Sequence, residues 1–262
     1  MSEVAALAIE PIRLPTVSYG PFRLMEAVPW LMFATAMRIV EVLGGLVGLC
    51  ASVCSHLSIF LAFLLAARRM IELADGRTGL GRLSFLEQLI LARKVLLPIV
   101  LLMLASCAVL IGAGARWTAL NSLLGIDGIA FDQYSYLGMV WSAFLAAVTL
   151  LMVLKAESTG HADLFAILKE LWQRAPCMLP GIVAVAAADI GLSVVQGMVR
   201  VVVYAYWHTP GPPQLMRTMV YFLFIFGFAS VRLWVTLAIL TFSLRESYRL
   251  GHAMPARSAK QA

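Results

Sequence analysis

The sequence predicts an all-α fold, a polytopic bundle of transmembrane helices. Of its 262 residues, 61% are hydrophobic and only 13% are charged, whereas a soluble domain carries roughly 25% charged residues. The apolar residues gather in five long runs, and a helix needs about 20 such residues to cross the hydrocarbon core. Helices are expected because a spanning helix satisfies its own backbone hydrogen bonds in lipid. We therefore expect one membrane domain with about five spans and short interfacial amphipathic helices.

The first 41 residues are expected to form an N-terminal tail and one short helix. The apolar run at 27–37 is too short to cross the membrane, and Arg38 and Glu41 follow it. We expect residues 22–40 to form an interfacial or re-entrant helix that begins near Pro29, with the N-terminus on the side opposite to the C-terminus. The alternative is a sixth, strained span here, which puts both termini on one side.

The transmembrane bundle is expected at 42–244, and a basic tail follows at 245–262. The five expected spans lie at 42–67, 95–115, 134–154, 177–199 and 218–244. The neighbouring spans are joined by connections too short for an independent domain, so the chain is expected to hold a single domain.

An amphipathic helix is expected before the second span and another before the fourth. Ser84 and Glu87 have the spacing of a capping box, which predicts a short helix ahead of Pro98. Asp163 can cap the other helix, in which Glu170 and Arg174 form a favourable i, i+4 pair.

The order of helix, proline and span occurs twice, at about 82–115 and 163–199, with Pro98 and Pro180 in matching places. This order resembles a group of bacterial polytopic membrane families, among them the helical membrane domain found beside some glycerophosphodiester phosphodiesterases. The resemblance implies a helical membrane fold. The phosphodiesterase activity of those proteins belongs to a soluble domain without a counterpart in this sequence, so no functional residue carries over.

Basic residues are concentrated on one side of the expected topology. The connections on that side, 68–94, 155–176 and 245–262, hold 13 Lys and Arg, against 6 in the opposite segments 1–41, 116–133 and 200–217. Loops rich in Lys and Arg stay in the cytoplasm. We therefore expect a multi-pass protein of a bacterial-type inner membrane with a cytoplasmic C-terminus.

The candidate site is a polar seam between the fourth and fifth expected spans. Its members share one face of each helix: Asp189, Ser193, Gln196 and Arg200 on one, Arg232 and Thr236 on the other. Asp189 and Arg232 lie at nearly equal depth, and an unpaired charge at mid-bilayer costs at least about 2.5–3.5 kcal/mol, so we expect them to pair. The pair either fixes helix packing or forms a gated path in which Asp189 takes up a proton or cation as Arg232 moves away.

A second polar stripe is expected in the first span. Gly44, Gly48, Ser52 and His56 recur every four residues, and the two glycines match a motif for close helix packing. His56 is expected to be neutral and hydrogen-bonded across this contact, and the alternative is a proton relay beside Asp189.

The sequence lacks the glycine-rich phosphate loops, hydrolase motifs and metal-ligand spacings of common enzymes, so we expect neither a cofactor nor a metal. Its basic residues flank the apolar runs, which is typical of membrane anchoring and not of nucleic-acid binding. The expected partners are the lipid bilayer and another membrane protein or a second copy. We expect an accessory or assembly protein and not an enzyme. The alternatives are a small transporter or permease-like protein that uses the seam, and a membrane-embedded enzyme that acts on lipid.

Overall fold

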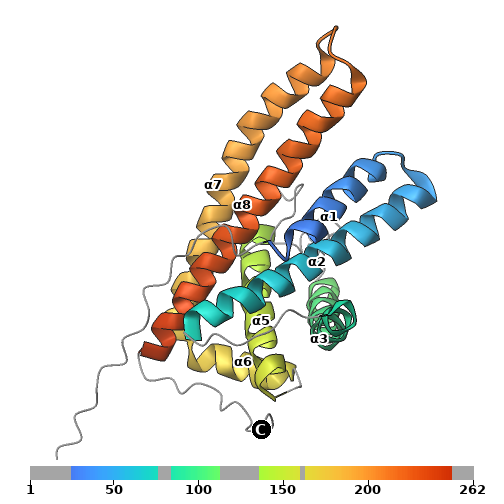
Figure 1. The fold of residues 1–262 in the computed structure, drawn as a ribbon. Helices are drawn as coiled ribbons and strands as arrows, with labels where there is room; N and C mark the ends of the chain where they lie inside the picture. The colour runs from blue at the N-terminus through green and yellow to red at the C-terminus, as the bar shows by residue number, and fades with distance from the viewer. Residues whose placement is uncertain (1–24, 76–83, 113–135, 160–162, 250–262) are drawn as a thin grey trace, which may run out of the picture.

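The computed structural model describes residues 25–75, 84–112, 136–159 and 163–249, and this part of the chain is almost entirely helical (Figure 1). Its seven helices are α1 (Val28–Glu41), α2 (Gly45–Asp75), α3 (Phe85–Gly112), α5 (Tyr136–Thr159), α6 (Leu164–Gln173), α7 (Ala175–His208) and α8 (Gln214–Arg249). Five of them, all but α1 and α6, are long and apolar enough to span a membrane. The predicted all-α helical bundle is confirmed, and its five apolar helices are those of a multi-pass membrane protein. The outer parts of the two expected tails, at 1–24 and 250–262, lie outside the described residues.

The helix ahead of the second span differs from its prediction. The capping box is confirmed: the Ser84 N–H donates to Glu87 Oε2 at 2.7 Å, and the Glu87 N–H donates to the Ser84 hydroxyl at 3.4 Å. The prediction of a separate short helix is wrong, because α3 runs without a break past Pro98. Proline removes one backbone hydrogen bond, but ending the helix in lipid would leave several backbone groups without partners.

The other amphipathic helix, α6, is confirmed. The Asp163 carboxylate accepts a hydrogen bond from the Phe165 N–H at 3.2 Å, and the apolar face of α6 is buried through Ile167 and Leu171. Arg174 pairs with Glu170 at 2.9 Å, as predicted. The next residue begins α7, whose first turn contains proline, the residue best suited to that position.

Two antiparallel hairpins, α1–α2 and α7–α8, are packed around α5 (Figure 1). Helix α5 is the most buried span, whereas α3 lies at the edge of the bundle. The core gathers where α2, α5 and the later part of α8 meet, and its largest fully buried side chains include Leu64, Leu150, Met152, Leu233 and Leu237. The α7–α8 hairpin extends beyond this core, so its far half is exposed on most sides.

Helix α1 packs antiparallel along α2. Glu26, just before α1, forms an ion pair with Arg69 near the end of α2. Further along, the Ser55 hydroxyl donates to the Ala34 carbonyl at 3.1 Å. Residue 26 therefore lies at the end of the bundle that holds Arg69. This position differs from the main topology prediction and agrees with the alternative, in which both termini lie on one side. The 14 residues of α1 rise about 21 Å, less than the ~30 Å of a hydrocarbon core.

The turn between α1 and α2 corrects the interpretation of Gly44. Gly44 and Gly45 have φ values of +68° and +61°, in the left-handed region that favours glycine. Gly44 therefore makes the turn and is not a contact inside a helix. Gly48 does lie in α2 at a close approach, since an added Cβ would lie 2.8 Å from the Glu41 carbonyl oxygen.

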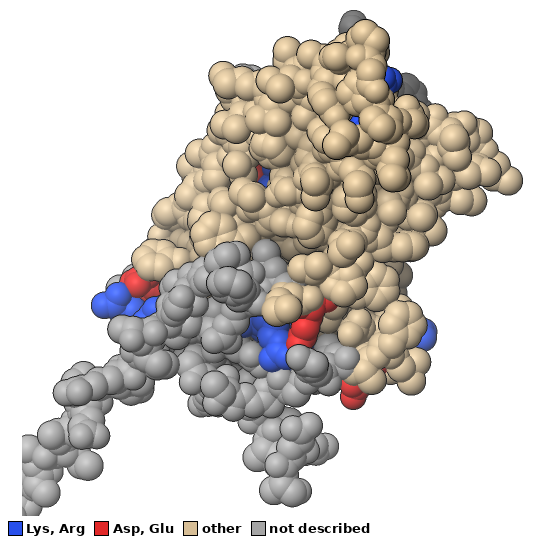
Figure 2. Space-filling model, turned by 45° about the horizontal axis from the view of Figure 1, so that its top comes forward, with Lys and Arg blue, Asp and Glu red and all other residues tan. Residues whose placement is uncertain are grey.

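The two ends of the bundle differ in their chemistry. At one, here called the arginine end, Arg68 of α2 pairs with Glu157 of α5 at 2.8 Å. Arg174 donates to the Ser247 hydroxyl at 2.9 Å and lies 4.8 Å from the centre of the Tyr248 ring. In Figure 2 blue and red side chains gather near the lower edge and most of the face is tan. The opposite end, where 209–213 joins α7 to α8, is called the loop end.

Candidate functional site

An ion pair lies inside the α7–α8 hairpin. The Arg232 Nε and Asp189 Oδ1 atoms are 3.5 Å apart, and the two side chains are only 6% and 5% exposed. Asp189 is on α7 and Arg232 on α8, so the two charges come from neighbouring helices of one hairpin. Thr236, one turn along α8 from Arg232, is buried as well. The structure thus brings together the two charges of the predicted seam.

The seam continues from this pair towards the loop end. Arg232 Nη2 donates to the Ser193 hydroxyl at 2.9 Å and to Gln196 Oε1 at 3.3 Å. The Ser193 hydroxyl in turn donates to the Asp189 carbonyl at 2.7 Å. One guanidinium therefore bridges three consecutive positions of one α7 face. From Asp189 to Arg200 this face rises about 16 Å at 1.5 Å per residue.

A pocket of about 260 Å³ lies at the loop-end side of the seam. Three elements line it, the end of α1, the middle of α7 and the first half of α8. Its lining residues are Arg38, Glu41, Val42, Gln196, Arg200, Tyr221, Phe224 and Ile225. Gln196 belongs both to the pocket and to the hydrogen bonds of Arg232, so the pocket and the buried ion pair form one polar region.

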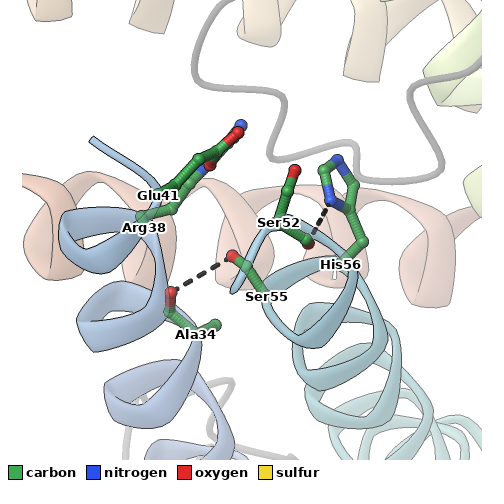
Figure 3. A network of polar contacts seen from close by, with 6 residues as sticks. All are labelled: Ala34, Arg38, Glu41, Ser52, Ser55 and His56. Carbon is green, nitrogen blue, oxygen red and sulfur yellow. Dashed lines mark hydrogen bonds and ion pairs between the residues drawn. The ribbon is translucent and has the colours of Figure 1, made fainter. Parts of the chain in front are cut away.

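The α1 wall of the pocket is a small polar network (Figure 3). Arg38 Nη1 and Glu41 Oε2 are 2.6 Å apart, at the last turn of α1. Burial alone would raise the pKa of Glu41, but the hydrogen bond and charge of Arg38, a hydrogen bond with Ser52 and the charge of His56 outweigh it and lower the pKa below its usual 4.5. Glu41 is therefore held as a carboxylate.

His56 belongs to this network on α2. Its Nδ1 lies 2.7 Å from the Ser52 carbonyl oxygen, so the ring is tied to its own helix and half-buried. In Figure 3 its ring lies on the side of α2 that carries Ser52, and Ser52 lies between the ring and Glu41. The predicted hydrogen bond across a helix contact is made instead by Ser55 to Ala34.

Sequence reasoning missed Arg38 and Glu41 as site residues. It treated them only as the polar end of a short apolar run, because nothing local shows that α1 turns back along α2 and reaches α7 and α8. A signal was present, however. Two opposite charges three residues apart, directly after the largely apolar run at 27–37, are costly at a membrane unless they have partners.

The charges of the whole region set what it can bind. Asp189 and Arg232 balance each other, and the pocket adds two guanidinium groups and one carboxylate. An amide, a phenol and an apolar wall lie beside these charges. Such a region suits a small polar or anionic group, and it has no nucleophile–base pair among the lining residues.

The comparisons with known proteins add no assignment. No family model, curated protein or solved structure matches the chain. The resemblance drawn from the order of helix, proline and span therefore stays an expectation.

Proposed function

We propose that the protein is a small permease-like transporter that takes a polar solute into the loop-end pocket and passes it along the α7–α8 seam. The observation that carries this proposal is the continuity of the polar region. Gln196 lines the 260 Å³ pocket and also accepts a hydrogen bond from Arg232, the partner of Asp189. A pair that served only to fix helix packing would not need a pocket beside it.

The arginine end supports the same proposal, because buried polar contacts join its helices. Ion pairs join α2 to α5 through Arg68 and Glu157, and Arg174 holds α6 against α8. A transporter that alternates its access has one side sealed while the other is open. In this proposal the buried arginines are the seal, and they separate when the pocket closes.

We further propose that the arginine end faces the cytoplasm of a bacterial-type inner membrane. The 13 basic residues of the segments on that side support this orientation through the positive-inside rule. The pocket then opens outward, and the aromatic residues Tyr204, Tyr206 and Trp207 lie at the outer interface, where such rings are enriched.

Thiol labelling tests whether water reaches the seam. In a background without Cys50, Cys54, Cys107 and Cys177, single cysteines replace Gln196 or its neighbour Val195, which is 49% exposed and does not line the pocket. A charged thiol reagent added at the loop end should modify Gln196→Cys and spare Val195→Cys. Equal reaction at both positions, or none at position 196, would contradict the proposal.

A second candidate function is that of an accessory protein which binds a membrane partner through the α7–α8 hairpin. The observation that favours it is length: α7 and α8, with 34 and 36 residues, rise about 51 and 54 Å, more than the ~30 Å hydrocarbon core. Co-purification in mild detergent separates the two candidates. Met198 and Met219 are both exposed on the hairpin. If a stoichiometric partner co-purifies and is lost when these two residues are replaced by charged ones, this candidate ranks first.

A further inference from the structure

We propose that α6 binds the membrane surface at the arginine end, where it lies in the plane of the bilayer and places Phe165 and Trp172 among the lipid headgroups. These two residues are called the aromatic edge of α6. The inference goes beyond the proposed function, because it concerns the arginine end alone and uses neither the loop-end pocket nor the seam.

Helix α6 crosses the end of the bundle. In Figure 1 it lies between the lower ends of α5 and α7, which both run upward from there, and it contacts both of them. Because α5 and α7 are long and apolar enough to span the membrane, a helix across their ends lies at the bilayer surface. Its 10 residues rise about 15 Å, half of what a span requires.

One face of α6 is already occupied by the protein itself. Ile167 and Leu171 are buried in the core of the bundle. Arg174, directly after the helix, pairs with Glu170 at 2.9 Å and donates to the Ser247 hydroxyl of α8 at 2.9 Å. This face fixes how α6 is oriented, so the side chains on its other faces are presented in a defined direction.

The aromatic edge lies on another face. Phe165 and Trp172 are each 81% exposed. They are seven residues apart, almost two full turns, so their side chains lie along the same edge of the helix. Ile167 follows Phe165 by two residues, and at about 100° per residue it points away from this edge. Two large rings side by side on an exposed edge indicate a surface that binds an apolar partner.

The residue types favour the bilayer interface as that partner. Tryptophan is enriched at the membrane–water interface, and helices that lie in it combine Trp or Phe with Lys. Lys169 is exposed, four residues after Phe165 and three before Trp172, so it lies beside the aromatic edge. Its long side chain can reach lipid phosphates. Soon after α6, Leu179 and Val183 are exposed on α7, a helix apolar enough to enter the bilayer.

A fluorescent label on α6 tests the proposal in vesicles of phosphatidylcholine and phosphatidylglycerol. In the full-length protein without its four cysteines, a single cysteine at Phe165, Trp172 or Gln173 carries an environment-sensitive fluorophore. Gln173 is the matched control, because it is exposed and adjacent to Trp172 but turned about 100° from it around the helix. Nitroxide-bearing lipids should quench the labels at 165 and 172 about threefold more than the label at 173, and aqueous iodide should do the reverse.

A photoreactive phenylalanine keeps an aromatic ring in place and identifies what the ring touches. We expect a benzophenone side chain at position 165 or 172 to form adducts with lipid when cells are irradiated. Mass spectrometry of the purified protein detects these adducts. The same side chain at position 173 should form fewer of them.

Three results would overturn the inference. Equal quenching by iodide at the three positions would show that the aromatic edge faces water. Protection from both quenchers, with a crosslink to a second copy or to another protein, would show that a protein covers it. The third is the absence of lipid adducts at both 165 and 172. None of these results changes whether Gln196→Cys is modified from the loop end, so this inference and the transport proposal fail separately.

Discussion

At the level of single residues, the Asp189–Arg232 pair is held by more than its mutual attraction. Arg232 also donates to Ser193 and Gln196, so its guanidinium satisfies polar atoms on two turns of α7. Taking two charges out of water is costly, and the pair is stable only because these extra hydrogen bonds accompany it. Removing one of the two charges should therefore destabilise the protein more than removing both.

We predict that Asp189→Asn or Arg232→Gln alone destabilises the protein by about 3–5 kcal/mol, since each leaves a buried charge without its counter-charge. The double variant Asp189→Asn with Arg232→Gln should recover most of this loss. Thermal unfolding in mild detergent measures it. Arg249→Gln breaks an exposed ion pair with Glu246 and should cost no more than about 1 kcal/mol. Additive losses in the double variant would show that the two charges do not stabilise each other.

Glu41 gives the pocket a pH dependence. Its pKa in the folded protein is lowered, with burial opposing and Arg38, Ser52 and His56 favouring the carboxylate. Its contribution to stability is therefore fully present above its usual pKa of 4.5 and is lost as the pH falls through the lower folded-state value. Unfolding measured between pH 3 and 7 should show this loss in the wild type. A Glu41→Gln variant with the same acid dependence would rule out Glu41 as its source.

At the level of elements, close approach between helices is set at a few small residues. Gly181 of α7 faces Ser243 of α8, where an added Cβ would lie 2.9 Å from the Ser243 Cβ and closer still to its hydroxyl. Gly44 and Gly45 make the turn that sends α2 back along α1. The two hairpins thus depend on glycines in different ways. In the α7–α8 hairpin Gly181 leaves space for the neighbouring helix, and in the α1–α2 hairpin Gly44 and Gly45 adopt the backbone conformation of the turn.

We predict that Gly181→Ala destabilises the protein by about 1–3 kcal/mol, because α7 and α8 must separate to admit the methyl group. Gly191→Ala, where the Cβ meets open space, should instead be neutral or stabilising, as expected for alanine in a helix. Adding Ser243→Gly to Gly181→Ala removes the clashing atoms and should restore part of the stability. If Ser243→Gly restores nothing, the cost of Gly181→Ala has another origin.

The sequence predicted the spans well and their partners only in part. Apolar runs and the cost of intramembrane charge are local properties, so the five spans and the Asp189–Arg232 pairing could both be inferred. The packing of α1 against α2 could not, because it depends on Glu26 meeting Arg69 and Ser55 meeting Ala34. The α1 wall of the pocket was missed for the same reason. The continuity of α3 through Pro98 was missed because a proline usually ends a helix in water, where freed backbone groups find partners.

At the level of the whole molecule, the two ends of the bundle differ in the polar contacts that they hold. Buried arginines join helices at the arginine end, while the loop end holds the pocket and the far half of the α7–α8 hairpin. The Glu26–Arg69 pair also fixes the side on which the described chain begins. Orientation in the membrane then decides which end meets which compartment.

We predict that residues 25 and 79 face the cytoplasm and that residue 211 faces outward. Single cysteines at Met25, Gly79 and Gly211 in the cysteine-free background test this, and Met25 is 73% exposed. An impermeant thiol reagent added to intact cells should label position 211 alone. If positions 25 and 211 are both labelled, Glu26 lies on the side of the membrane opposite to Arg69. That result would contradict the antiparallel packing of α1.

If the seam carries a solute between the two ends of the bundle, as we propose, Ser193 must be reachable from both faces of the membrane. Ser193 lies between the ion pair and the pocket, where it contacts Arg232 at 2.9 Å. In sealed vesicles of one orientation, a charged thiol reagent should modify Ser193→Cys when added from either face, because access alternates. Modification from the loop-end face alone would mean a fixed pocket above a permanent seal, and the protein would then be no transporter.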